Sequence, residues 1–248
     1  MASINKNRFQ VFWVSFVALS LPIGSTAANV DGFTVQVGTH AEWHIHSVNA
    51  QPVPWYRIGV WTYLGSWKAE NGSEISYTVT AVNEDVYGDL NIGNLTVTNS
   101  SSAEIASALV LGILTWSPGL ITHTDWVKHT EEAQEQANSE WVNGTLTVPE
   151  KNQVYMGKTF ETISFILVST SQNTTLVYEK NSGALLEAQT GFGAYFLDIE
   201  ISSIDPPLKE VKGVFFSLTW LVVILPLLFL TGIRIWKRRE RISARRKI

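Results

Sequence analysis

Residues 41–46 read Ala-Glu-Trp-His-Ile-His and alternate apolar with polar side chains. Successive side chains of an extended chain point to opposite faces, so such a run gathers its apolar members on one side. The apolar members are Ala41, Trp43 and Ile45, and the polar members are Glu42, His44 and His46. This pattern predicts a half-buried strand of an antiparallel sheet, with one face on a core and the other in solvent.

The same alternation recurs on both sides of this run. We expect further strands over residues 33–37, 56–64, 73–82 and 87–98, and again after residue 145 over 158–170, 174–180, 184–190 and 193–202. Gly88 and Gly93 interrupt the 87–98 run and indicate a bulge or bend within it. The turn Asn181-Ser182-Gly183 fits a three-residue hairpin with Gly183 in the left-handed region.

Between the two sets of strands, a segment of about 102–142 takes the period of a helix. Ser101 and Glu104 have capping-box spacing and predict a helix from residue 103 to about 111. Thr124 is the expected N-cap of a second helix, which ends near Asn143 and Gly144. The inward stripe of this helix is Trp126, Thr130, Ala133, Ala137 and Trp141. We expect the stripe to be buried and to pin the core, because small alanines between two indoles let a sheet approach closely.

The ends of the chain indicate export and anchoring. Residues 213–233 carry no charge, and a helix of this length measures roughly 32 Å, enough to cross a bilayer core. The charged start, the apolar run over residues 9–21 and the small residues near Ala28 are typical of a secretory signal. The expected organisation is a signal peptide (1–28), an extracellular β-rich domain (29–207), a linker (208–212), a transmembrane helix (213–235) and a basic cytoplasmic tail (236–248). An uncleaved N-terminal anchor is the alternative reading of residues 1–28.

Taken together, these patterns predict an α+β fold that is mainly antiparallel β. A curved sheet carries the two-helix insert (about 102–142), and one C-terminal transmembrane helix follows.

The overall charge of −4 conceals a division along the chain. Residues 29–212 hold 21 Asp and Glu against 8 Lys and Arg, a net charge of −13, whereas residues 234–248 hold 8 basic residues against Glu240, a net charge of +7. Positive flanks mark the cytoplasmic side, so the acidic domain is expected outside. An acidic domain argues against nucleic acid as a partner, because phosphate binding needs a basic face. The basic tail fits a topological role, with anionic lipid headgroups as a further partner.

Candidate chemistry is sparse. His44 and His46 share a strand face and are weak candidates for a metal site, although this spacing is common by chance. Asp198 and Glu200 also share a face, but a solvated acidic surface is the simpler explanation for the pair. The chain lacks cysteine, which excludes disulfides, thiolate metal sites and a cysteine nucleophile. No phosphate loop, G-x-S-x-G or H-E-x-x-H motif occurs, so we expect no enzyme, no cofactor and no tight metal site.

Two further features concern the outer domain. Five N-x-S/T sequons, at Asn71, Asn94, Asn99, Asn143 and Asn173, predict glycosylation of at least some of these asparagines. Seven tryptophans lie between residues 43 and 141. Core packing explains them most simply, and an apolar groove for a lipid or glycan, lined by Trp116, Trp126 and Trp141, is the functional alternative.

Two segments have recognisable sequences: Thr174–Ala188, TTLVYEKNSGALLEA, and Trp116–Trp126, WSPGLITHTDW. With the final apolar segment and its basic tail, they resemble a group of uncharacterised archaeal single-pass surface proteins. That resemblance implies a signal peptide, a β-rich ectodomain with a helical insert and a C-terminal anchor, without implying an activity. The strand–turn–strand pattern is also similar to curved-sheet lipoprotein carriers, which hold a lipid between a sheet and a helix.

We therefore expect a cell-membrane protein with its N-terminal domain outside and its C-terminus in the cytoplasm. Its ectodomain would have a non-enzymatic binding or structural role, with an extracellular protein, glycan or lipid as the partner. A carrier or sensor of an apolar ligand is the alternative, and a hydrolase is the third possibility. Whether the inward tryptophans fill the interior or enclose a void discriminates between the first two.

Overall fold

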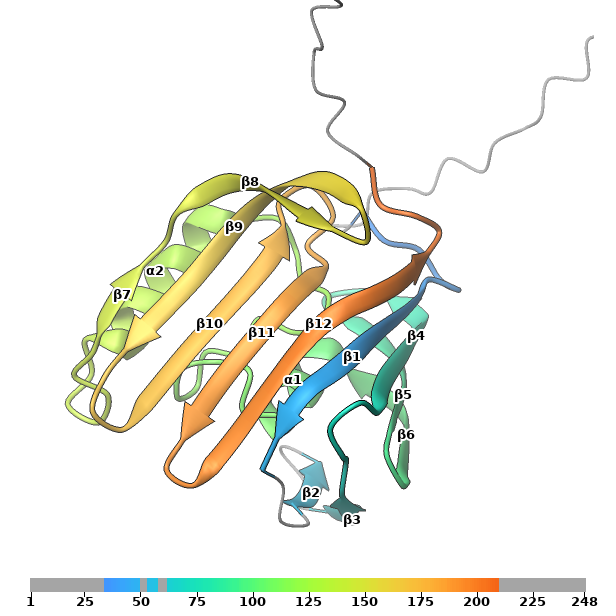
Figure 1. Cartoon of the computed structure of the whole chain (residues 1–248), viewed down its shortest axis with the longest axis horizontal. Coiled ribbons are helices and arrows are strands. Elements are labelled where there is room, and N and C mark those ends of the chain that lie inside the picture. The colour runs from blue at the N-terminus through green and yellow to red at the C-terminus, as the bar shows by residue number, and fades with distance from the viewer. Residues whose placement is uncertain (1–33, 50–52, 58–61, 210–248) are drawn as a thin grey trace, which may run out of the picture.

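The structure is a computed structural model that describes residues 34–49, 53–57 and 62–209 (Figure 1). The expected signal peptide, transmembrane helix and basic tail lie outside the described residues, as does most of the linker. Within the described part of the chain, neither helix is long and apolar enough to cross a membrane.

One ten-stranded antiparallel sheet dominates the structure (Figure 1). In spatial order its strands are β6 (Leu95–Ser101), β5 (Val86–Ile92), β4 (Glu74–Val82), β1 (His40–Val48), β12 (Tyr195–Asp205), β11 (Leu185–Phe192), β10 (Gln172–Glu179) and β9 (Lys158–Val168). The far edge of β9 pairs with both β7 (Thr145–Thr147) and β8 (Glu150–Tyr155). A separate two-stranded sheet joins β2 (Val53–Arg57) to β3 (Thr62–Trp67).

The position of β1 defines two ends of the sheet. His40, at the start of β1, pairs with Asp205, at the end of β12, so the chain enters and leaves the sheet on the same side. We call this side the terminal end. The opposite side, which carries the β5–β6, β9–β10 and β11–β12 turns, is the distal end (Figure 1).

One face of the sheet is covered by the segment between β6 and β7 (Figure 1). This segment holds α1 (Ser102–Ala108) and α2 (Trp126–Ala137), which pack near β5 and β6 and near β7 and β9 respectively. Its inward side chains are fully or almost fully buried against the strands: Ile105, Leu109, Leu111, Ile113, Trp116, Leu120, Ile121, Ala133 and Ala137. We call this the covered face, and it contains the core.

The other, open face is crossed near the terminal end by the β8–β9 hairpin (Figure 1). The hydroxyl of Tyr155 at the end of β8 donates a hydrogen bond of 2.7 Å to Glu187 on β11. Thr162 and Ser164 on β9 are buried even though they alternate with residues that point to the core. The hairpin therefore closes part of a face that simple alternation assigns to solvent.

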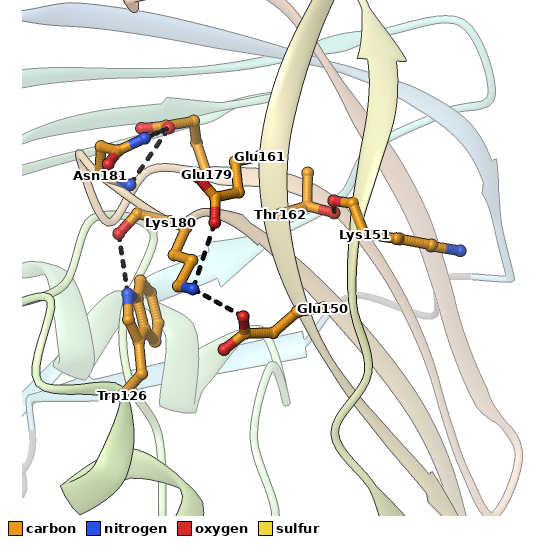
Figure 2. A network of polar contacts seen from close by, with 8 residues as sticks. All are labelled: Trp126, Glu150, Lys151, Glu161, Thr162, Glu179, Lys180 and Asn181. Carbon is orange, nitrogen blue, oxygen red and sulfur yellow. Dashed lines mark hydrogen bonds and ion pairs between the residues drawn. The ribbon is translucent and has the colours of Figure 1, made fainter. Parts of the chain in front are cut away.

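Figure 2 shows how the strands are tied together at the terminal end. The ammonium group of Lys180 donates to Glu150 on β8 at 2.6 Å and to Glu161 on β9 at 3.2 Å, and these contacts raise the pKa of Lys180. Its backbone carbonyl accepts a 2.8 Å hydrogen bond from the indole of Trp126. One residue thus connects β8, β9 and the start of α2.

The buried carboxylate of Glu179 organises the adjacent β10–β11 turn. It accepts hydrogen bonds from the backbone of Asn181 at 3.1 Å and of Ser182 at 2.6 Å. Gly183 has a φ of +74°, and a Cβ there would lie 1.9 Å from the carbonyl oxygen of Thr122. The predicted left-handed Gly183 is confirmed, but the hairpin loop has four residues (180–183) instead of three, because the N–H of Glu179 binds the carbonyl of Ala184 at 2.8 Å. The close approach of residue 122 is a second reason for glycine.

Three of the strand predictions need correction. Residues 34–37 form no strand, because they lead into a turn at Gly38. The run 87–98 is two strands, since Gly93, with a φ of +53°, reverses the chain; the bulge near Gly88 is present. The run 56–64 belongs to two paired strands, β2 and β3, instead of one.

The helix boundaries also differ. Ser101 caps α1 by accepting from the backbone N–H of Glu104, which confirms the cap, but the helix ends at Ala108. The N-cap of α2 is Asp125, not Thr124, and the helix ends at Ala137.

Trp141, predicted to be buried, is 84% exposed. The chain leaves its helical path after Asn138, so the helical phase is lost and Val142 takes the inward position in place of Trp141.

Two tryptophans provide a test of this core. Trp43 is fully buried and its indole donates a 2.9 Å hydrogen bond to the carbonyl of Leu185, whereas Trp141 is exposed. We expect Trp43→Ala to lower the free energy of unfolding of the full-length chain by about 3–5 kcal/mol. Trp141→Ala should change it by less than about 0.5 kcal/mol. Thermal or denaturant unfolding measures both, and similar losses in the two variants would contradict the fold.

Candidate apolar cleft

The segment that follows α1 has an unusual backbone. The N–H of Leu111 binds the carbonyl of Ala106 at 2.7 Å, and the N–H of Val110 binds the carbonyl of Ser107 at 3.0 Å. This is the Schellman pattern, in which a left-handed residue ends the helix and is usually glycine. Here that residue is Val110, with a φ of +57°. A β-branched residue in this region is a true outlier and is strained.

A second outlier follows four residues later. Ile113 and Trp116 bind each other through both backbone N–H and C=O groups, which closes a two-residue turn. Leu114 is the first residue of this turn and has a φ of +50°, at a position where Asn, Asp or Gly is preferred. Strained residues persist only when their surroundings hold them, and they cluster at functional sites.

Three strands hold this loop in place through side-chain donors. The hydroxyl of Tyr195 on β12 donates to the carbonyl of Leu109 at 3.0 Å, and that of Thr190 on β11 donates to the carbonyl of Val110 at 3.0 Å. The amide of Gln172 on β10 donates to the carbonyl of Gly112 at 2.6 Å. Because Gln172 and Thr190 are buried, these bonds form in a low-dielectric environment where they are strong.

Between the loop and the strands lies a cleft of about 260 Å³, which we call the loop cleft. It opens at the distal end of the covered face. Its walls are Ser107, Val110, Gly112, Leu114, Ser117, Gln172 and Phe192. None of these side chains is charged, and Leu114 and Phe192 remain 45% and 51% exposed, which is high for large apolar side chains. The cleft is thus an uncharged, mostly apolar site with a few hydrogen-bonding groups.

The sequence did not reveal this site. Glycine at position 112 is required because a Cβ there would lie 2.2 Å from the carbonyl oxygen of Trp116, but a lone glycine has many explanations. The strain at Val110 and Leu114 depends on backbone angles that composition does not report. Gln172 lies 60 residues from Gly112 in the chain, so their contact depends on the sheet.

The expected tryptophan groove is not formed by these residues. Trp116 is 5% exposed and packs on Phe165 with ring centroids 4.9 Å apart. Trp126 is partly buried and packs on Tyr178, while Trp141 points away from the core. The two inward indoles therefore fill the space between sheet and helices.

The metal candidates lie on the open face of β1. The rings of His44 and His46 are 5.1 Å apart in an edge-to-face arrangement, and His46 contacts Glu200 at 3.3 Å. Among residues 34–49, 53–57 and 62–209, no group of three or more His, Asp or Glu side chains is placed to hold a metal ion. Asp198 and Glu200 both lie on β12, and the carboxylate of Glu200 is the group that contacts His46.

His129 lies on the inward side of α2 and is buried, away from His44 and His46 on the open face of β1. The Nε2 atom of His129 lies 3.2 Å from the carbonyl of His123 and 2.9 Å from the hydroxyl of Thr122, so it carries the hydrogen of a neutral ring. Its Nδ1 atom is buried without a partner among the described residues. The ring of His123 stacks on it at 4.1 Å. Burial, together with His123, lowers the pKa of His129 to about 4.

The five sequon asparagines are all exposed. Asn71, Asn94, Asn143 and Asn173 lie at the distal end, next to turns or strand ends, and Asn99 lies within β6. Both polar atoms of the Asn94 side-chain amide are hydrogen-bonded. Its oxygen accepts from the backbone N–H of Lys68 at 3.0 Å, and its nitrogen donates to the backbone carbonyl of Ser66 at 3.3 Å. The sequons of the distal end are brought together by the fold and not by their spacing.

In comparisons with known proteins, no family model matched the chain, and no curated protein or solved structure matched it significantly.

His129 makes the stability depend on pH. Its pKa is about 4 in the folded chain against 6.5 as the ordinary value, so the unfolded chain binds the proton more readily. Protonation of His129 therefore favours the unfolded chain. The free energy of unfolding has its full value above pH 6.5 and falls by about 3 kcal/mol as the pH decreases toward 4. His129→Phe keeps an aromatic ring and should flatten this dependence, measured by denaturant unfolding of the full-length chain between pH 7 and 4. The same change at exposed His46 is the control, and an unchanged slope in His129→Phe would contradict the assignment.

Proposed function

We propose that this chain is a non-enzymatic binding protein of the cell surface, whose domain presents the loop cleft to a small, uncharged, mostly apolar molecule. The proposal also includes export through a signal peptide (1–28) and anchoring by a transmembrane helix (213–235). Because the chain enters and leaves the sheet at the terminal end, a membrane anchor after Lys209 would leave the cleft at the far side of the domain. A ligand from outside would then reach the cleft directly.

The observation that carries the proposal is the strained rim. Left-handed Val110 and Leu114 each cost on the order of 1–3 kcal/mol, and three side-chain donors on three strands hold the loop against that cost. Glycine or asparagine at these positions would remove the strain. Instead, the rim presents apolar side chains around a fixed opening, which is a preorganised binding site.

The chemistry of the walls restricts the ligand. Apolar atoms of Val110, Leu114 and Phe192 favour an apolar body, while Ser107, Ser117 and Gln172 offer neutral hydrogen-bonding groups. A charged ligand would lose its hydration without gaining a counter-ion. The volume of about 260 Å³ lies just below the usual range of about 300–1,000 Å³ for drug-sized ligands. A carrier that encloses a whole lipid chain is favoured less, because Trp116 and Trp126 fill the interior.

Binding is tested with N-phenyl-1-naphthylamine, an uncharged apolar fluorophore, added to the full-length chain in detergent-free nanodiscs. We expect saturable enhancement of its fluorescence above the signal of empty nanodiscs, whose lipid also takes up the fluorophore. Ser107→Phe should fill the cleft and weaken binding at least about tenfold, the loss of roughly 1.4 kcal/mol. Ser202→Phe, on the exposed surface of β12, is the matched control. Equal binding by both variants would refute the site.

The strain gives an independent test. Leu114→Asn places a residue that tolerates the left-handed region in the turn, and Leu114 is 45% exposed, so little packing is lost. We expect the free energy of unfolding to rise by about 1 kcal/mol while the fluorophore binds several-fold more weakly. A variant that is less stable and binds normally would show that Leu114 serves the fold and not the cleft.

A further inference from the structure

Gly191 on β11 has no explanation in the fold. Its φ is not positive, and a Cβ added there would meet its nearest atoms at 3.8–3.9 Å, which is ordinary contact. Glycine weakens the interior of a strand, and it often marks a place where another group approaches closely. The backbone of β11 would therefore accept a larger residue, and the open surface above Gly191 is what glycine preserves.

Two side chains flank this opening on the open face. Asn173 on β10 and Phe196 on β12 are both direct partners of Gly191, so all three residues point to the same face. The strands of Asn173 and Phe196 are about 10 Å apart, twice the spacing of neighbouring strands. Because glycine has no side chain, the space between Asn173 and Phe196 on this face is open.

The gap belongs to a depression of about 520 Å³ at the distal end, which we call the Gly191 depression. Its lining includes Asn49, Thr170, Asn173, Gly191, Gly193 and Phe196. Asn49 fixes the far wall, because its side chain accepts from the backbone of Phe196 at 2.6 Å. The walls combine amide and hydroxyl groups with the aromatic residues Phe192, Tyr195 and Phe196, and none of the lining side chains is charged.

Asn173 is also the first residue of the sequon Asn173-Thr174-Thr175. Its side chain is exposed and makes no hydrogen bond to the described residues, whereas the amide of Asn94 is bonded at both ends. We propose that Asn173 carries an N-linked glycan whose first sugar lies in the Gly191 depression against the ring of Phe196. The apolar face of a pyranose matches an aromatic ring, and its hydroxyls match the amide and hydroxyl walls.

The modification requires a glycosyl diphosphate donor linked to a polyisoprenoid, and a transferase supplied by the exporting cell. The Nδ2 atom of Asn173 forms a bond to C1 of the sugar as the bond from C1 to the diphosphate oxygen breaks. The diphosphate leaves with the electron pair, and the amide proton passes to a base of the transferase. This inference goes beyond the loop cleft and depends on export of the domain.

The test uses the full-length chain produced in a host that attaches N-glycans. Mass spectrometry of its peptides should find Asn173 occupied. Compared with Asn173→Gln, the glycosylated chain should melt about 2–4 °C higher, the shift expected for a modest stabilising contact in a domain of this size. In a Phe196→Ala background this increment should fall by at least half, and Gly191→Thr should reduce it similarly by filling the depression.

Asn143→Gln is the control, because Asn143 lies outside the depression and its increment should not respond to Phe196→Ala. An unoccupied Asn173, or a melting increment that keeps its wild-type size in the Phe196→Ala and Gly191→Thr backgrounds, would overturn the proposal. Gln172 and Phe192 line both the loop cleft and the Gly191 depression, whereas Ser107 lines only the first and Asn173 only the second. Fluorophore binding in the loop cleft should therefore be equal in the wild type and Asn173→Gln. If the loop cleft does not bind the fluorophore, the test of the glycan at Asn173 is still valid. If Asn173 carries no glycan, the test of the loop cleft is still valid.

Discussion

The structure depends on the pairing of β1 with both β12 and β4. Strands β4–β6 form one antiparallel run along the chain and β7–β12 form another, and only β1 joins them into a single sheet. Trp43 lies at the centre of this junction, where its indole donates to the carbonyl of Leu185, 142 residues away in the sequence. Because the first strand pairs with the last, His40 at the start of β1 lies beside Asp205 at the end of β12, and the distal end of the sheet is on the side away from both.

The segment between the two runs of strands explains why the interior is full. It covers one face of the sheet with two short helices and a loop whose apolar side chains occupy the space beneath them. The loop is stabilised less by its own preferences than by donors from β10, β11 and β12, which bind the carbonyls of Gly112, Val110 and Leu109 beyond the end of α1. The loop cleft exists because these three bonds fix a backbone that would otherwise relax.

The two faces of the sheet therefore serve different purposes. The covered face supplies the core and, at its distal rim, an uncharged cleft. The open face carries acidic and histidine side chains on β1 and β12, is partly closed by β8, and has a gap at Gly191. The loop cleft and the Gly191 depression both lie at the distal end, which would be the exposed end of the domain under the proposed C-terminal anchor.

Local periodicity determined much of the fold. The alternation of residues 41–46 predicted β1 and its buried face, capping-box spacing predicted the start of α1, and the Asn-Ser-Gly turn predicted the β10–β11 hairpin. These signals depend on neighbours in the chain, which the sequence displays directly. The predicted mainly antiparallel sheet with a two-helix insert is accordingly what the described residues show.

Tertiary structure alone decided the rest. Trp141 has the spacing of a buried helical residue, but the helix ends at Ala137 and Val142 replaces it in the core. His129 is buried because α2 packs it against Trp116 and Trp126, which the spacing of histidines in the sequence does not indicate. The loop cleft joins residues 107–117 to Gln172 and Phe192, and the Gly191 depression joins three strands. Such contacts depend on strand order and register, which bring distant residues together and which no local pattern of side chains encodes.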